Sequence, residues 1–462
     1  MKNFDFLIQA GRSCRLLCLF VLLFETASAA ELELLDPPEI VGQSSPGKAW
    51  VANRVFFDLH TVGDRQFIAY YDEERDMTVG MREVGSDAWQ TTELPSKLMW
   101  DSHNSVVMGI DPAGYIHVSG NMHVHPLDYF RSAKPYDTSE MIEVDRMVGE
   151  DEDRVTYPKF FHNREGDLLF SYRSGSCGNG NILVNRFNTD SLEWERYLQV
   201  PLFEGVEESD DRAAYHSFVK DSSGNFHFIW IWRWTPMVET SHQICYATTP
   251  DMKTWKNAAG DVVSLPFRPD DPAVIVDGTP SGGGMHNGRY KIILTREDEP
   301  VVGYIKYDEV GLTQFYMARH DGSEWQSRKI SDWDFRWEFF GGGDGMSSGG
   351  SFRFAGLSEE GHIVVDWSTE VGQSGRYVIN PKTLEPAAGP VRFHPQMPVS
   401  IQDRLTDRPG LSVRMVPGTV HGDPAGSSYI LKWESGPASH GRNAPEVMPS
   451  GPLSDVLILE YK

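Results

Sequence analysis

Apolar and aromatic residues alternate with polar ones in many short stretches of this chain, and the spacing typical of amphipathic helices is scarce. Seven stretches are rich in β-branched and aromatic residues, and each follows a turn signal. They cover residues 66–71, 115–119, 167–172, 225–232, 300–307, 362–367 and 429–433. Most successive stretches start roughly 50 to 65 residues apart, which is in the range of propeller blades that carry loops. The pattern therefore predicts an all-β protein, a seven-bladed β-propeller.

A turn followed by a tryptophan recurs beside these stretches, at Trp89, Trp194, Trp255 and Trp325. It resembles the bacterial neuraminidase repeat, in which a tryptophan on a blade strand packs under the turn. Residues 455–460 form an apolar strand, and its pairing with an early strand over residues 51–59 could close the ring and remove an exposed edge. A β-helix would need shorter repeats, and a β-sandwich rarely sustains seven such units. We therefore expect one catalytic propeller domain over residues 30–462.

Residues 1–29 have the organisation of a secretory signal peptide. Basic residues come first, an apolar run covers residues 16–24, and the small residues of 27–29 offer a cleavage site. The apolar run is too short to anchor the chain in a membrane. We therefore expect a secreted protein, periplasmic or extracellular. Cleavage would leave Cys177 and Cys245, which could form one disulfide or stay as free thiols.

Acidic residues outnumber basic ones, with 66 Asp and Glu against 42 Lys and Arg and a net charge of −24. This balance argues against nucleic acid or an anionic membrane as a partner. It also argues mildly against a polyanionic glycan, unless one cleft is locally basic. An acidic surface is often a solubility feature of an exported protein, so net charge says little about the substrate. We expect a monomer.

Side chains that could carry chemistry gather in three segments next to strand ends. The first segment contains His103, the second contains His123, and the third contains Tyr157 and Arg173. Loops at strand ends are where such folds place their sites. A lone histidine is usually structural, but these side chains fall on consecutive units and could converge on one end of a central channel.

The segment from Asp101 to about residue 343 closely resembles the BNR-repeat propeller family that includes ulvan lyases. The likeness covers Ser-His-Asn, Gly-Tyr-Ile-His-Val-Ser-Gly-Asn-Met-His, Tyr-Phe-Arg-Ser, Glu-Asp-Arg-Val-Thr-Tyr-Pro, Ser-Gly-x-x-Gly-Asn-Gly-Asn and Ile-Ser-Asp-Trp-Asp-Phe-Arg-Trp. Within the family the sequence is most similar to polysaccharide lyase family 25, with family 24 as a relative. Two histidines, a tyrosine and an arginine form the site of these lyases. By motif and spacing, the resemblance implies four catalytic residues here, with Tyr215 as a further member of the site: His103, His123, Tyr157 and Arg173.

Such a lyase removes the C5 proton of a uronate and expels the sugar linked through O4. Arg173 suits the neutralisation of the adjacent carboxylate, because a guanidinium binds carboxylates bidentately and keeps its charge. Tyr157 could act as base and then as acid, and the histidines titrate nearer neutrality. The C5 proton and O4 lie on one face of glucuronate and on opposite faces of iduronate. We therefore hypothesise that Tyr157 donates to O4 in both, and that His103 or His123, on the other side of the sugar, is the base for iduronate.

Other polar residues could contact the substrate, although each one alone is more often structural. They are Asn104, His125, Tyr215, Arg233 and Arg336, and, as weaker candidates, His216, His286 and Arg289. The chemistry requires no cofactor. His242 and Cys245 have a ligand-like spacing, and relatives carry bound metal ions, but two residues do not make a zinc site. Any zinc or calcium ion would be structural, and its ligands stay unassigned.

The sequence thus predicts a polysaccharide lyase that cleaves a sulfated, uronate-containing glycan of the ulvan type, with rhamnose linked to glucuronate or iduronate, by β-elimination. One alternative is a glycoside hydrolase that removes rhamnose from glucuronate, which normally needs a pair of carboxylates. Another is a glycan-binding propeller without catalytic activity. The absorbance of an unsaturated uronate, formed from ulvan, separates these functions.

Overall fold

The computed structural model describes residues 31–206, 212–342, 349–422, 426–441 and 444–462. Almost every regular element in these residues is a β-strand, and the helices are three short 3-10 turns, η1 (Val238–Thr240), η2 (Pro272–Val274) and η3 (Val399–Gln402). The predicted all-β class is therefore confirmed. None of the helices in the described ranges is long and apolar enough to cross a membrane. The predicted signal peptide lies outside the described residues.

Seven sheets of three to six strands, most of them built from consecutive strands, account for most of the described chain. The first three sheets contain β3 (Asp58–Val62), β4 (Arg65–Tyr71), β5 (Asp76–Glu83), β6 (Gln90–Lys97) and β31 (Thr419–His421); β7 (Val107–Ile110), β8 (Ile116–Ser119), β10 (Tyr129–Lys134) and β11 (Asp137–Glu143); and β9 (His123–His125), β12 (Val155–His162), β13 (Leu168–Ser176), β14 (Asn179–Asn188) and β15 (Glu193–Arg196).

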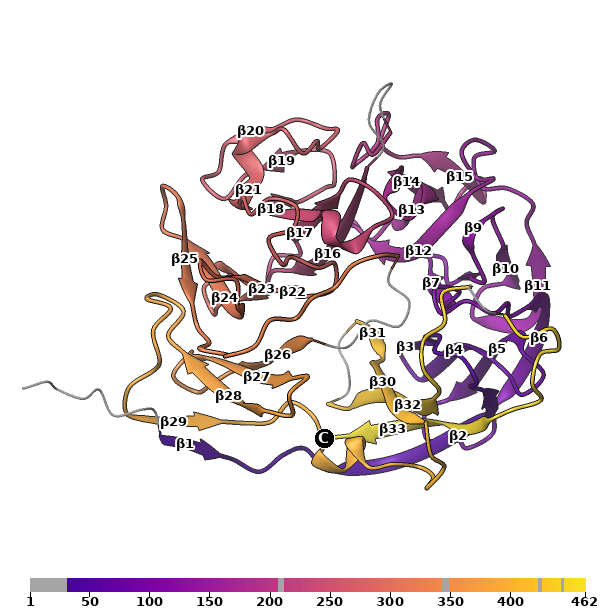
Figure 1. Cartoon of the computed structure of the whole chain (residues 1–462). Helices are drawn as coiled ribbons and strands as arrows, with labels where there is room; N and C mark the ends of the chain where they lie inside the picture. Colours follow the sequence, from indigo (N-terminus) through magenta and orange to yellow (C-terminus); the bar gives the residue numbers. More distant parts are fainter. Residues whose placement is uncertain (1–30, 207–211, 343–348, 423–425, 442–443) are drawn as a thin grey trace, which may run out of the picture.

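The next two sheets contain β16 (Ala213–Lys220), β17 (Phe226–Arg233), β18 (Ser241–Thr249), β19 (Trp255–Lys256), β20 (Val262–Val263) and β21 (Ile275–Asp277); and β22 (Tyr290–Leu294), β23 (Pro300–Tyr307), β24 (Thr313–His320) and β25 (Trp325–Lys329). The last two contain β26 (Gly350–Leu357), β27 (Ile363–Thr369) and β28 (Ser374–Ile379); and β2 (Ile40–Trp50), β30 (Ser412–Pro417), β32 (Ser428–Ser435) and β33 (Leu453–Tyr461). A separate parallel pair joins β1 (Glu31–Leu34) and β29 (Pro390–Phe393). In Figure 1 the seven sheets lie one after another around a common centre.

Each of the seven predicted stretches falls in a different one of these sheets, on β4, β8, β13, β17, β23, β27 and β32. The turn before β8 shows why the local sequence was sufficient to predict the position of the strand that follows it. The Asp111 carboxylate accepts the backbone N–H of Tyr115 at 2.9 Å, and Gly114 takes a φ of 91°, which favours glycine. Such turns are specified by residues adjacent in sequence, so they can be predicted without knowledge of the packing.

The predicted pairing of the two chain ends was only partly correct. The C-terminal strand β33 pairs antiparallel with β2, so the partner is Ile40–Trp50 and not residues 51–59. In Figure 1 the indigo β2 runs beside the yellow β33. Strand β2 was missed because its middle reads Gln-Ser-Ser-Pro-Gly-Lys, and this polar composition fits its largely exposed face. Residues 51–59 instead lead into β3, which pairs with β4 and β31.

Large aromatic side chains fill the space between neighbouring sheets. Trp433 of β32 stacks on Phe57 at a centroid distance of 4.6 Å, and both side chains are at most 2% exposed. Burial of this apolar surface is the main stabilising contribution in such a core. The two cysteines left open by the sequence are free thiols, Cys177 partly buried and Cys245 buried.

Candidate active site

The inner strands of the sheets enclose a cavity of about 820 Å³. Its lining residues come mainly from strands β12 and β13 of one sheet and from β16, β22 and β26 of the next three sheets along the chain. Five cationic side chains line it: Arg54, Lys159, Arg173, Lys291 and Arg353. Among the described residues that line it there is no Asp or Glu. The cavity is thus locally basic in a chain whose net charge is −24.

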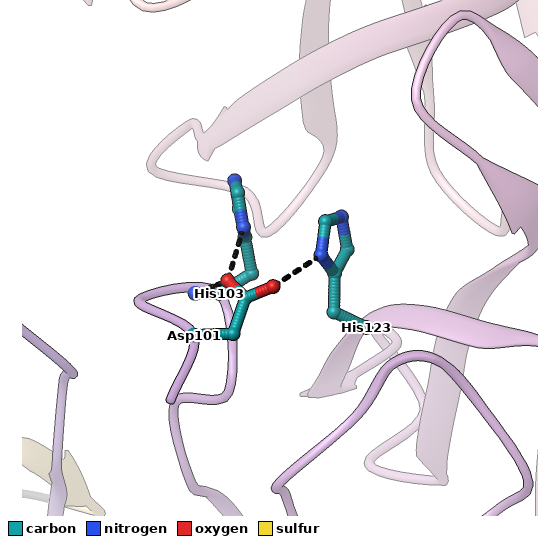
Figure 2. Close-up of side chains that lie close together, drawn as sticks. All are labelled: Asp101, His103 and His123. Carbon is teal, nitrogen blue, oxygen red and sulfur yellow. Dashed lines mark hydrogen bonds and ion pairs between the residues drawn. The ribbon is translucent and has the colours of Figure 1, made fainter. Parts of the chain in front are cut away.

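A single carboxylate joins the two predicted histidines at one edge of this cavity. Asp101 and His103 lie in the loop between β6 and β7, and His123 begins β9. His103 Nδ1 lies 2.6 Å from Asp101 Oδ1, and His123 Nδ1 lies 2.8 Å from Oδ2 (Figure 2). The ring centroids of the two histidines are 4.0 Å apart. The structure therefore brings His103 and His123 together through a residue that the sequence had not singled out.

Tyr157 lies against both imidazoles. Its ring centroid is 5.6 Å from that of His103 and 5.9 Å from that of His123. The residue interrupts the β12–β13 pairing and has a φ of 55°, a backbone conformation that is costly for a bulky side chain and is often found at functional sites. Burial and the nearby Tyr215 raise the pKa of Tyr157, and the charge of Arg173 only partly opposes this. The phenol is therefore protonated at neutral pH.

Arg173 is the buried cation of the site. It is 1% exposed, and its Nη atoms donate to the backbone carbonyls of Ala214 at 2.6 Å and Ser176 at 3.2 Å. Its Cζ lies 5.0 Å from the ring centroid of Tyr157 and 4.4 Å from that of Tyr215. No carboxylate of the described residues forms an ion pair with it, so its charge is balanced only by dipoles and aromatic rings.

Two further predicted residues border this group. Tyr215 lines the cavity from β16, and its Oη is 3.3 Å from the backbone nitrogen of Gly178. Arg233 is 3% exposed, and its Nη1 lies 3.4 Å from both Tyr215 Oη and Asn287 Oδ1. The structure thus places Tyr215 in the cavity wall, with Arg233 behind it.

Other candidates lie elsewhere or have protein partners. Asn104 is fully buried and donates to Asn121 at 3.2 Å, and it does not line the cavity. His125 Nδ1 lies 3.3 Å from the backbone nitrogen of His123. Arg336 lies over the ring of Tyr307 at 3.9 Å and lines a different cavity of about 270 Å³. The structure therefore does not bring Asn104 or Arg336 to the group around Tyr157.

Of the two weaker histidine candidates, His216 lines the cavity and His286 does not. His216 stacks on Phe203 at 5.3 Å, and burial holds its pKa well below the usual value. His286 packs against Trp337 at 5.3 Å, and burial together with the charge of Arg289 lowers its pKa to about 3. Both imidazoles are neutral at physiological pH.

Several residues of the cavity were missed by sequence reasoning. His440 lies with its ring 4.8 Å from that of His103, and the neighbouring Ser439 carbonyl accepts the backbone N–H of Ser102 at 2.6 Å. No local signal connects these two distant segments. Lys159 had a signal, because it follows Tyr157 by two residues and strand side chains alternate between faces.

One group of described residues has donor atoms close enough together to suggest a metal: Asp101, His103 and His123, within 4.8 Å. Zinc bonds of about 2.0 Å to nitrogen and oxygen would separate tetrahedral ligands by about 3.3 Å. The observed Nδ1–carboxylate distances of 2.6 and 2.8 Å fit hydrogen bonds better.

The other metal-ligand spacing noted in the sequence does not form such a group. His242 Nδ1 bonds the Thr240 carbonyl at 3.0 Å, and the ring stacks on Trp234 at 4.6 Å. Cys245 is buried, which raises the pKa of its thiol and disfavours a ligating thiolate.

The fold and the cavity define an all-β protein whose sheets surround a basic centre, with no Asp or Glu among the described residues that line it. The chain belongs to the BNR repeat-containing family, whose model matches residues 65–333. The family resemblance seen in the sequence motifs is thereby confirmed.

Two curated relatives of this chain are ulvan lyases. The ulvan lyase, long isoform, of Alteromonas sp. (strain LOR) is 26% identical over 183 residues, which cover 29% of this chain and 18% of that protein. The ulvan lyase, long isoform, of Pseudoalteromonas sp. (strain PLSV) is 25% identical over 183 residues, with the same coverage of 29% and 18%. The match thus spans less than a fifth of these relatives.

Solved structures resemble the chain over most of its length. The crystal structure of polysaccharide lyase Uly1 has a TM-score of 0.60 at 14% identity, covering 91% of this chain and 99% of that one. A PL25 ulvan lyase bound to -[GlcA(1-4)Rha3S]- has a TM-score of 0.56 at 12% identity, covering 85% and 93%. At these identities the likeness shows a shared fold.

Proposed function

We propose that this protein is a polysaccharide lyase that cleaves a sulfated, uronate-containing glycan of the ulvan type by β-elimination. The observation that carries the proposal is the buried Arg173, which forms no ion pair with a described carboxylate. It lies over the ring of Tyr157 in a cavity without Asp or Glu among its described lining residues. The seven sheets would be the blades of a seven-bladed propeller, and the cavity would be its central channel. The protein would be exported by residues 1–29 to meet a polymeric substrate.

The basic cavity fits the electrostatic demand of this reaction. Removal of the C5 proton places negative charge next to a carboxylate, so the intermediate requires a cation nearby. Arg173 supplies a permanent charge that is poorly screened because it is buried. Lys159 and Lys291 line the same cavity and have no ion pair with a described carboxylate, so they would attract the sulfate and carboxylate groups of the chain.

In this proposal two residues share the proton transfers. Tyr157 has a raised pKa and keeps its proton, which suits the donor to the leaving O4. His103 lines the cavity, is held by Asp101, and suits the base that takes the C5 proton. Their ring centroids are 5.6 Å apart, too close for a sugar to lie between the rings. Both groups would therefore approach one face of the sugar, which fits syn elimination from glucuronate better than anti elimination from iduronate.

The two alternatives are less well supported. A hydrolase normally uses two carboxylates that flank the scissile bond. No carboxylate of the described residues lines the cavity, and Asp101 behind His103 is already engaged with two imidazoles. A protein that only binds glycan would not need a protonated tyrosine next to an unpaired buried cation.

The experiment is incubation with ulvan while the absorbance of the unsaturated uronate is followed. A rise supports the lyase, reducing sugar without it supports the hydrolase, and neither supports simple binding. Tyr157→Phe should lower the rate by roughly 10²- to 10⁴-fold, the usual contribution of a general acid. Tyr136→Phe, at an outer turn with a hydroxyl outside the cavity lining, is the matched control and should retain the rate. Near wild-type elimination by Tyr157→Phe would refute this assignment.

A further inference from the structure

The Asp101 carboxylate serves two histidines at once, and the two have unequal access to the cavity. We propose that Asp101 is a positioning residue that presents Nε2 of His103 to the substrate as the proton-accepting atom, with His123 as a second donor that fixes the carboxylate, a role that rests on the proposed lyase function.

The hydrogen bonds define which nitrogen of each ring carries a proton. Ionised carboxylates only accept hydrogen bonds, so Nδ1 of both rings must carry the hydrogen at distances of 2.6 and 2.8 Å. Burial alone would raise the pKa of Asp101, but the hydrogen bonds from His103 and His123 outweigh it and hold that pKa well below its usual range. The carboxylate is therefore ionised at any working pH, and each neutral imidazole has its lone pair on Nε2.

Access distinguishes the two histidines. His103 has a side-chain exposure of 26% and lines the cavity, whereas His123 has 15% and does not. Nε2 of His123 is buried and has no hydrogen-bond partner among the described residues. In Figure 2 the carboxylate lies between the two rings, and each oxygen faces one of them. A substrate in the cavity can therefore reach His103 but not the proton-accepting atom of His123.

The imidazole ring of His103 has close neighbours that can also carry charge or hydrogen-bond donors. The ring centroids of His103 and His123 are 4.0 Å apart, so two imidazolium charges at these positions would repel each other. Tyr157 and His440 also face His103, at centroid distances of 5.6 and 4.8 Å. Asp101 is the anion that touches the pair, so it stabilises the single imidazolium that forms when His103 takes a proton.

A neighbouring loop keeps this carboxylate away from bulk water. A Cβ added to Gly441 would lie 3.0 Å from Asp101 Oδ2, so the backbone after His440 packs directly on the carboxylate. The backbone nitrogen of His103 also donates to Oδ1 at 2.9 Å. The carboxylate is thus fixed from three sides, which is what a group that orients two rings requires.

The test is Asp101→Asn, which keeps the shape and replaces one acceptor by an NH₂ donor. The amide can accept from only one ring, so the other ring must move its proton to Nε2. We expect kcat to fall roughly 10- to 100-fold, with KM changed less than about twofold. The acid limb of the pH–rate profile should move to lower pH, because an imidazolium without the carboxylate loses its proton more readily. Asp221→Asn is the matched control, since Asp221 contacts His227 Nε2 at 3.4 Å in an outer turn.

Imidazole ¹⁵N spectra give a readout that does not depend on activity. In the wild type, His103 and His123 should both show the Nδ1–H form, and Asp101→Asn should convert one of them. An Nε2–H form of either ring in the wild type would overturn the proposal, even if the variant failed to fold. An unmoved acid limb in an active Asp101→Asn would overturn it as well. A wild type that forms no unsaturated product from ulvan would refute the lyase function, while these spectra would still decide the role of Asp101.

A second pair of variants decides which of the two histidines is the base. His103→Ala should abolish the acid limb together with most of the rate, because it removes the base. His123→Ala should lower kcat but keep an acid limb, because His103 retains its bond to Asp101. The reverse order of effects would show that His123 is the base and would overturn the assignment.

Discussion

Strand β12 carries Tyr157 near one end and His162 at the other, and a histidine cluster lies at each end. The first cluster is the one around Asp101, His103 and His123. In the second, His60 Nδ1 lies 2.8 Å from His421 Nε2, and His162 Nε2 bonds a backbone carbonyl at 2.6 Å. At about 3.3 Å per residue along a strand, Tyr157 and His162 lie roughly 16 Å apart.

The two clusters differ in what their nitrogens contact. In the second cluster the nitrogens bond one another, a main-chain oxygen and Asp58, whose Oδ1 is 3.3 Å from His60 Nε2. In the first cluster Asp101 bonds both Nδ1 atoms, which leaves Nε2 of the cavity-lining His103 open, whereas Nε2 of His123 is buried. The second cluster lines none of the larger cavities found in the described residues, and the first borders the basic one. Gathered histidines are therefore not sufficient for a site; an open nitrogen and an unpaired cation beside a cavity make the difference.

The largest effect on activity is expected when the buried cation Arg173 is removed. Arg173→Ala should lower kcat/KM on ulvan by about 10³-fold, because the developing charge loses its buried partner, and Arg173→Lys should restore only part of the rate. Steady-state rates measured by absorbance provide the check. Arg82→Ala is the control, since Arg82 is also buried, lies over a tryptophan ring and donates to neutral oxygens. Equal losses in both variants would indicate a general packing defect.

A smaller effect is expected when the two lysines that line the cavity are removed. It should show whether cationic side chains beyond the first cluster also bind the anionic groups of the substrate. The double variant Lys159→Ala/Lys291→Ala should raise KM roughly 5- to 10-fold, leave kcat nearly unchanged and weaken the dependence of KM on salt. Initial rates at several salt concentrations measure this. Lys48→Ala/Lys382→Ala removes the same charge from exposed positions outside the cavity and should leave KM unaltered. If KM rises equally in both, net charge and not the cavity determines binding.

The smallest effect on activity, and a distinct one on stability, is expected in the second cluster. Burial, His60 and His162 lower the pKa of His421 to about 3, so between about pH 6.5 and that value the unfolded chain binds a proton that the folded one excludes. Stability present above pH 6.5 is therefore lost as pH falls, by up to about 1.4 kcal/mol per pH unit. His421→Gln should show a smaller decrease of Tm from pH 7 to pH 5 than the wild type, with kcat changed less than about twofold. Identical pH dependence of Tm would contradict this, as would a large loss of kcat.

Much of the fold could be predicted because its signals are local. Alternating side chains define each strand, and turns such as Asp111 to Gly114 are specified by their own residues, so each of the seven stretches lies in a separate sheet. Part of the candidate site could be predicted as well, because His103, His123, Tyr157 and Arg173 stand in long motifs. The position of Arg336 could not be predicted, because the ring on which it lies belongs to a strand outside its own segment.

The sequence by itself determined the all-β class, the approximate strand positions and the residue types that could carry an elimination. Only the tertiary structure decided that β2 pairs with β33, that His440 reaches His103, and that one carboxylate holds two imidazoles. It also decided that the cavity is basic although the chain is acidic. The physical reason is the range of the interactions. Turns and strand alternation depend on neighbours in sequence, whereas strand pairing, burial and local charge depend on which distant segments pack together.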